Sequence, residues 1–149
     1  MVTVYLDTCC LNRPFDDQSQ SRIHLEAEAV LLILLYHELG YWEWVSSEVV
    51  DYEIEQNSAE AHRMAVRELA GVAGKTVRIK DTITRRATEI ETWGIDGFDA
   101  LHLACAESAG VSVFLTTDDK LVKKSKKYQD FLTVRVENPL VWIQEMEKK

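Results

Sequence analysis

Apolar residues along the chain fall into two kinds of segment, one with helical spacing and one that is short and rich in β-formers. The longest helical pattern begins at Ser21 and stops at Gly40, and glycine is favoured just beyond a helix end. In the helix predicted from Ser58 to Val72, the spacing points Met64 and its apolar neighbours toward the core. Further helices are predicted from Ser46 or Ser47 to about Gln56, from Asp81 or Thr82 to Gly94, from Asp96 to Ala109, over the lysine-rich segment after Asp118, and onward from Asn138.

The short β-rich segments alternate with these helices. The first ends at Asp7, and a loop that contains Pro14 is expected after it. Alternating strands and helices are typical of α/β proteins, so we expect a three-layer α/β/α sandwich around a mostly parallel sheet, in a single domain over residues 1–149. The five predicted strands are Val2–Leu6, Tyr41–Val45, Val77–Ile79, Val111–Thr116 and Val134–Val136.

The composition and net charge of the chain indicate a globular domain and limit how it can bind nucleic acid. Of 149 residues, 46% are hydrophobic and 28% are charged, which is the balance of a soluble globular domain rather than a disordered chain. The net charge of −8 disfavours binding to duplex DNA by general attraction. It does not exclude an enzyme that acts on nucleic acid, because clustered carboxylates that hold cations also make a chain acidic.

Cysteines and apolar runs exclude further classes. Cys9, Cys10 and Cys105 are odd in number and show no CxxC spacing, which argues against a disulfide framework or a zinc site. No signal peptide is visible, and the longest apolar stretch, Ala29–Tyr36, is too short to cross a bilayer. We therefore expect a cytoplasmic protein without membrane contact.

Two acids follow predicted strands directly. Asp7 ends the first strand and Asp118 ends the strand before the lysine-rich segment. Ligands of open parallel sheets bind outside the carboxyl ends of the strands, so these two acids are candidates for one shared site. A plain turn acid is the alternative for each of them.

Two more acids stand among apolar helix positions. At ~100° per residue, Glu48, Asp51 and Glu55 share one face of their helix, whereas Glu53 lies on the opposite, apolar face. Burying a lone acid is costly unless the acid is paired or binds a metal. Asp99 also lies on an apolar helix, although a capping box with Asp96 explains it equally well.

Four carboxylates in one pocket repel one another unless a cation is present. If Asp7, Glu53, Asp99 and Asp118 converge, a hard divalent ion such as Mg²⁺ or Mn²⁺ would compensate their charge. Such a site suits phosphodiester hydrolysis, because the metal polarises the phosphoryl group and generates hydroxide from water.

The segments around these acids resemble the PIN-domain family over essentially the whole chain. They are Tyr5–Thr8, Ser46–Glu53, Phe98–Ala104 and Leu115–Asp118. The resemblance implies a Rossmann-like fold and a Mg²⁺- or Mn²⁺-dependent endoribonuclease that acts on single-stranded RNA. Many small bacterial members are VapC-like toxins of type II toxin–antitoxin pairs, which a cognate antitoxin holds inactive and which are usually homodimers.

The resemblance carries the family's catalytic, metal-binding acids onto the same four positions, Asp7, Glu53, Asp99 and Asp118. One departure is Cys9, which stands where the family often has Asn. The residues expected to support the site are Thr8 and Thr117, whose hydroxyls can orient a carboxylate or hold a metal-bound water, Asp119, which can exchange roles with Asp118, and Asp96.

Other polar residues keep two interpretations. Lys123, Lys124, Lys126 and Lys127 form either a solvated helix face or an edge that follows RNA phosphates. His102 is expected to be a hydrogen-bonded core histidine, with general-base catalysis as the alternative. Two other functions stay open: an aspartyl-nucleophile phosphatase, disfavoured because Cys9 replaces the second Asp of that chemistry, and a PIN-like interaction module without activity.

Overall fold

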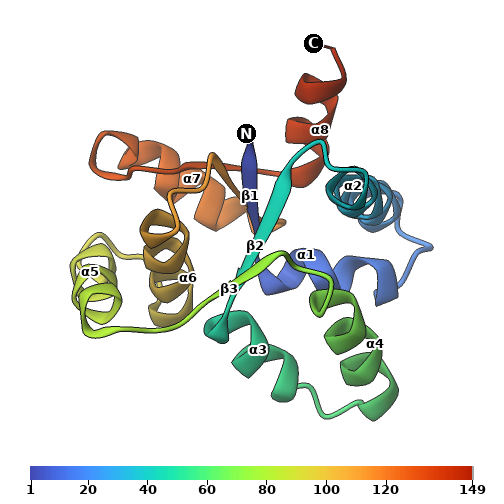
Figure 1. The fold of residues 1–149 in the computed structure, drawn as a ribbon, viewed down its shortest axis with the longest axis horizontal. Coiled ribbons are helices and arrows are strands. Elements are labelled where there is room, and N and C mark those ends of the chain that lie inside the picture. The colour runs from blue at the N-terminus through green and yellow to red at the C-terminus, as the bar shows by residue number, and fades with distance from the viewer. Residues whose placement is uncertain (149) are drawn as a thin grey trace.

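The computed structural model describes residues 1–148 and contains a five-stranded sheet in which every neighbouring pair of strands is parallel (Figure 1). The strand order is β3-β2-β1-β4-β5, so β1 is central. The chain leaves β1 toward β2 on one side and later returns to place β4 on the other, which makes the β1–β4 boundary a topological switch point. The strands are β1 (Thr3–Leu6), β2 (Glu43–Ser47), β3 (Lys75–Val77), β4 (Val113–Leu115) and β5 (Arg135–Glu137).

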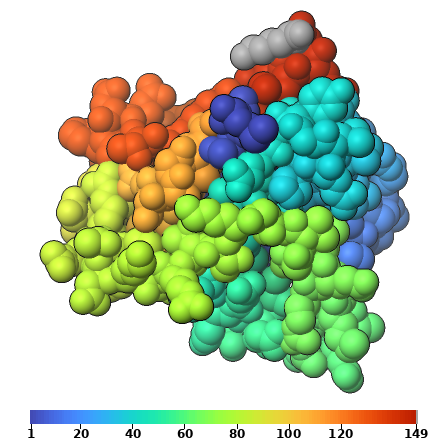
Figure 2. Space-filling model, in the orientation of Figure 1, coloured from blue at the N-terminus to red at the C-terminus, as the bar shows by residue number. Residues whose placement is uncertain are grey.

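Helices cover both faces of this sheet, which confirms the predicted α/β/α architecture. In Figure 1 the long second helix and the last helix lie on one side, and the fifth and sixth helices lie on the other. Figure 2 shows the first residues and the last helix at one end of the molecule, opposite the third and fourth helices. The helices are α1 (Thr8–Asn12), α2 (Ser21–Glu38), α3 (Glu48–Glu55), α4 (Glu60–Ala70), α5 (Asp81–Glu91), α6 (Gly97–Ser108), α7 (Asp119–Lys127) and α8 (Pro139–Glu147), with 3₁₀ turns at Arg13–Phe15 and Gln129–Phe131.

The core is built around the central strands. Trp44, Tyr5 and Phe114 are the largest of the fully buried side chains, and Tyr5 stacks on Phe114 with ring centroids 5.2 Å apart. Strands buried on both faces are expected in a parallel sheet that helices cover on either side. Within residues 1–148, no helix combines the length and the hydropathy needed to cross a bilayer.

The local expectations for the segment after β1 and for the third strand were wrong. The segment after Asp7 is a short helix, α1, where a loop was expected. Local propensity does not favour this helix, but packing stabilises it, since Cys10 and Leu11 are completely buried. The third strand lies two residues before the predicted segment. Its expected end, Ile79, instead donates its N–H to Glu48 Oε1 at 2.7 Å, outside the ladder.

The inward face of α4 also differs from the prediction. Val66 and Ala70 are buried, whereas Met64 is 55% exposed and Val72 is 41% exposed. Apolar residues occupy a wide arc of this helix, so their spacing does not define which part of the arc faces inward. The helix packs against α3 and α1, and Val66 and Ala70 are its buried residues.

Candidate functional site

The candidate site lies at the carboxyl ends of β1 and β4, at the switch point of the sheet. Leu6 and Leu115 are paired in the ladder, and the next backbone N–H, that of Asp7, donates to Leu115 O at 2.9 Å. The Thr116 hydroxyl donates to Asp7 Oδ2 at 2.8 Å. Ligands bind at this position in open α/β sheets, and here the chain places a buried carboxylate.

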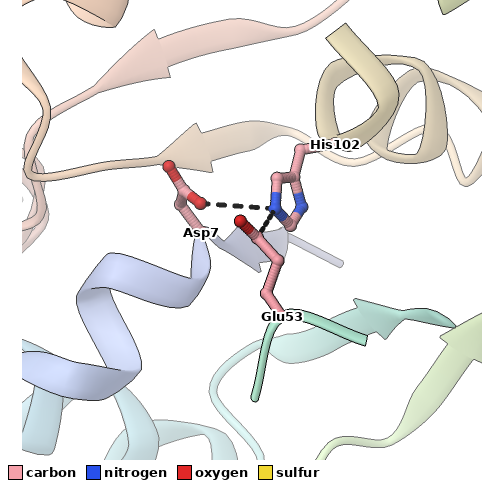
Figure 3. A group of neighbouring side chains, drawn as sticks. All are labelled: Asp7, Glu53 and His102. Atoms are coloured by element: carbon pink, nitrogen blue, oxygen red, sulfur yellow. Dashed lines mark hydrogen bonds and ion pairs between the residues drawn. The ribbon is translucent and has the colours of Figure 1, made fainter. Parts of the chain in front are cut away.

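A second carboxylate and an imidazole lie beside Asp7 (Figure 3). His102 Nε2 is hydrogen-bonded to Glu53 Oε1 and lies 3.5 Å from Asp7 Oδ1. One ligand atom from each of these three residues lies within 4.8 Å of the others. The Thr8 hydroxyl donates to the same Glu53 oxygen at 2.8 Å. The structure therefore brings the start of α1, with Asp7 and Thr8, against Glu53, although 45 positions separate Thr8 from Glu53 in the chain.

A buried chain of hydrogen bonds holds Glu53 in place. The Tyr5 hydroxyl bridges Ser47 Oγ at 2.6 Å and His102 Nδ1 at 2.7 Å. Ser47 is also the N-cap of α3 and accepts the N–H of Val50 at 3.3 Å. Because a carboxylate only accepts, Nε2 of His102 carries the proton in its bond to Glu53. The path Ser47–Tyr5–His102–Glu53 thus connects the start of α3 to the acid farther along the same helix.

The charged groups at this site shift each other's pKa values. Burial by itself would raise the pKa of Glu53, but the hydrogen bonds from His102 and Thr8 outweigh it and lower that pKa. Burial likewise acts to lower the pKa of His102, but Glu53 and Asp7 outweigh it and raise the pKa. Both shifts favour a carboxylate at Glu53 beside a charged imidazole.

Asp99 lies in the first turn of α6 and is half-buried. Burial raises its pKa to about 7; the Asp7 carboxylate adds to this rise, His102 opposes it and Asp118 contributes further. The alternative explanation of Asp99, a capping box with Asp96, is met only in part: Asp96 is the N-cap of α6, but its side chain accepts the N–H of Gly97 at 3.0 Å. Within residues 1–148 the Asp99 carboxylate has no hydrogen-bond partner, and its charge is favoured instead by the nearby His102.

Asp118 and Asp119 have different surroundings. Asp118 is the N-cap of α7 and its Oδ1 accepts the N–H of Lys120 at 3.0 Å. Asp119 is exposed and forms a two-point ion pair with Arg22, at 2.6 and 2.7 Å. Of these two acids, Asp118 contributes to the raised pKa of Asp99, whereas Asp119 is paired with Arg22.

Sequence reasoning missed Thr116 and underrated His102. Thr116 rather than Thr117 presents its hydroxyl to Asp7, and Cys9 Sγ lies 3.4 Å from the same Thr116 oxygen. The contact follows from the pairing of β1 with β4, so only knowledge of the strand order would have predicted it. His102 is fully buried and hydrogen-bonded, as expected, but its partners are Tyr5 and the candidate acid Glu53.

The donor set fits a hard divalent cation. Asp7 and Glu53 supply carboxylate oxygens, which Mg²⁺ and Mn²⁺ prefer. Asp99 lies outside this close group, and its pKa is raised mainly by burial, with the Asp7 and Asp118 carboxylates adding to the rise. His102 Nε2 directs its proton at Glu53, so it orients this ligand rather than serving as one.

The PIN domain family model matches residues 4–127 of the chain. Two similar solved structures are VapBC2 from Rickettsia felis bound to a DNA fragment from their promoter, and VapBC-1 from nontypeable Haemophilus influenzae. The first has a TM-score of 0.60 at 13% identity, covering 92% of this chain and 98% of that one. The second has a TM-score of 0.59 at 15% identity, covering 93% and 98%. These likenesses show the fold. A comparison with curated proteins finds no match.

Proposed function

The chain belongs to the PIN-domain family, whose members are generally nucleases, and on that premise we propose that it is a divalent-metal-dependent endoribonuclease for single-stranded RNA. The observation that carries the proposal is the group of acids at the switch point. Asp7 and Glu53 lie side by side there, and Asp99 interacts with Asp7 through their charges. Acids that repel one another at one site indicate a functional site, because a bound cation compensates their charge.

In this proposal Asp7, Glu53, Asp99 and Asp118 hold Mg²⁺ or Mn²⁺. When bound, the cation would polarise the scissile phosphoryl group and acidify a water molecule. The chain's own hydroxyls and imidazole fix the carboxylates: Thr116 orients Asp7, while Thr8 and His102 orient Glu53. Preorganised ligands lose little freedom when the ion binds, and their hydrogen-bond partners raise metal affinity.

The test combines metal binding with cleavage of single-stranded RNA. Calorimetric titration with Mg²⁺ and Mn²⁺ should show binding, and cleavage should need either ion and stop with a chelator. Asp7→Asn should abolish both, because it removes one ligand charge from the cluster. Asp130→Asn, an exposed acid in the 3₁₀ turn after α7, is the matched control and should change neither. Metal binding without cleavage would favour an interaction module instead.

We also propose that the protein is the toxin of a type II toxin–antitoxin pair, that it acts in the cytoplasm and that it forms a homodimer. The similarity to VapBC structures supports an antitoxin partner, as does the apolar surface of α2. Leu25, Leu31 and Leu35 on α2 are each close to half exposed, beside a groove of about 400 Å³ that α8 completes. Contiguous apolar surface of this kind is typical of a face that another protein covers.

A further inference from the structure

Two exposed aromatic rings lie next to the acids in the sequence and against each other in space. Tyr52 directly precedes Glu53 on α3, and Phe98 directly precedes Asp99 on α6. The two rings stack with centroids 5.7 Å apart and planes inclined by 22°. Tyr52 is 53% exposed and Phe98 is 48% exposed, so much of each ring faces solvent.

From this arrangement we infer that Tyr52 and Phe98 form a stacking platform for one nucleobase of a single-stranded RNA held at the acid cluster. The inference rests on the proposed function and adds a base-binding subsite to it. Aromatic rings bind single strands by stacking on the bases, which requires no particular sequence because every base has a π-face. In this inference, a strand whose phosphate is held through a cation at the acid cluster places a neighbouring base against these rings.

The adjoining cavity suits a base better than a phosphate. It has a volume of about 360 Å³ and is lined by Glu48, Val49, Tyr52, Ile79, Phe98 and Leu101. Glu48 carries the one charged side chain of this lining, and its Oε1 is held by the Ile79 N–H at 2.7 Å. A carboxylate at the rim repels a phosphate and accepts a hydrogen bond from an exocyclic amino group. The ligand class is therefore a flat, uncharged base of any kind, and a base that bears an amino group gains a hydrogen bond to Glu48 in addition.

The net negative charge of the protein is a further argument for binding RNA through stacked bases. A polyanion gains little from general attraction to a chain of net charge −8. Two of the lysines of α7 are also engaged: Lys124 donates to Gly94 O at 2.6 Å, and Lys126 lies 3.6 Å from Glu137. Interactions that do not depend on charge must then supply a large share of the affinity for RNA.

Binding of short single-stranded RNA, followed by fluorescence anisotropy at several salt concentrations, tests the platform. Tyr52→Ala and Phe98→Ala should each weaken affinity by roughly ten- to a hundredfold, the range expected for one stacked base. The reduction should be equal at every salt concentration, because stacking releases no counterions. Tyr52→Phe should retain wild-type affinity, whereas Tyr52→Leu, which is apolar but not flat, should not.

Tyr41→Ala is the matched control. Tyr41 is 66% exposed, but it precedes β2 and so lies at the opposite end of the sheet from the acids. This variant should bind RNA as the wild type does. In cleavage assays, Tyr52→Ala should raise KM and leave kcat nearly unchanged, the pattern of an interaction made equally in ground and transition states.

An oligonucleotide that lacks one base adds a double-mutant cycle. Removing the base at the stacked position should weaken binding to the wild type, and Tyr52→Ala should then weaken it no further. If the wild type cleaves RNA and the aromatic variants bind it unchanged, the platform is wrong and the nuclease proposal stands. If the wild type neither binds nor cleaves RNA, both fail. If the variants lose RNA binding together with a dimer in light scattering, the rings form a protein interface and the inference is overturned.

Discussion

Replacing Asp99 with Asn measures how strongly the clustered acids oppose folding of the metal-free protein. The pKa of Asp99 is about 7 in the folded chain against an ordinary value of 3.8, because burial and the Asp7 carboxylate disfavour its charge. The folded state therefore keeps a proton that the unfolded state releases. Stability contributed by this proton is fully present below about pH 4 and is lost as pH rises through about pH 7.

The difference between 3.8 and about 7 corresponds to about 4 kcal/mol at most. The side chain is only half-buried, so solvent screens its charge and a smaller value is expected. We expect Asp99→Asn to exceed the wild type by about 1–2 kcal/mol in free energy of unfolding near pH 8 without metal. Near pH 4, where neither folded protein carries a charge at this position, the two should agree within about 0.5 kcal/mol.

Urea unfolding in a chelating buffer at the two pH values provides these free energies, and Asp130→Asn serves as the control for removal of an exposed acid. Excess Mg²⁺ should then stabilise the wild type more than Asp99→Asn, since a ligand that binds only the folded state adds stability by mass action. A variant that is less stable than the wild type at both pH values would refute the electrostatic reasoning. Asp99 would then stabilise the first turn of α6.

Three more outcomes are expected. Tyr5→Phe removes the hydroxyl that holds His102, so calorimetry should show metal affinity lowered by about 10–100-fold; unchanged affinity would mean that His102 needs no such support. Replacing the lysines of α7 with Gln should reduce the salt slope of RNA binding by ~0.7 for each phosphate that they neutralise in the wild type, and an unchanged slope would make this face merely solvated. The lysines to be replaced are Lys123, Lys124, Lys126 and Lys127. Light scattering at micromolar concentration should give a dimer, and a monomer would contradict the proposed assembly.

Features governed by local periodicity could be predicted from the sequence. The alternation of strands and helices predicts the α/β/α fold, and the helical wheel separates Glu53 from its acidic neighbours. Glu53 indeed lies beside Asp7, within 4.8 Å of it and of His102. Both predictions depend on patterns a few residues long, which the 3.6-residue period of the helix determines.

Features governed by long-range pairing could not be predicted. Thr116 contacts Asp7 across 109 positions, and nothing near Thr116 distinguishes its hydroxyl from that of Thr117. The helix α1 forms because Cys10 and Leu11 enter the core, which local propensity does not reveal. The tie from Tyr5 to His102 likewise joins residues 97 positions apart, so only the folded sheet brings them together.

The central position of β1 has a consequence for how the protein is made. Its partner β4 begins at Val113, and the third candidate acid, Asp99, reaches the site only through the helix that leads into that strand. A nascent chain therefore carries no assembled cluster until nearly the whole domain has left the ribosome. Under the ribonuclease function proposed above, any N-terminal fragment that ends before β4 should therefore be inert.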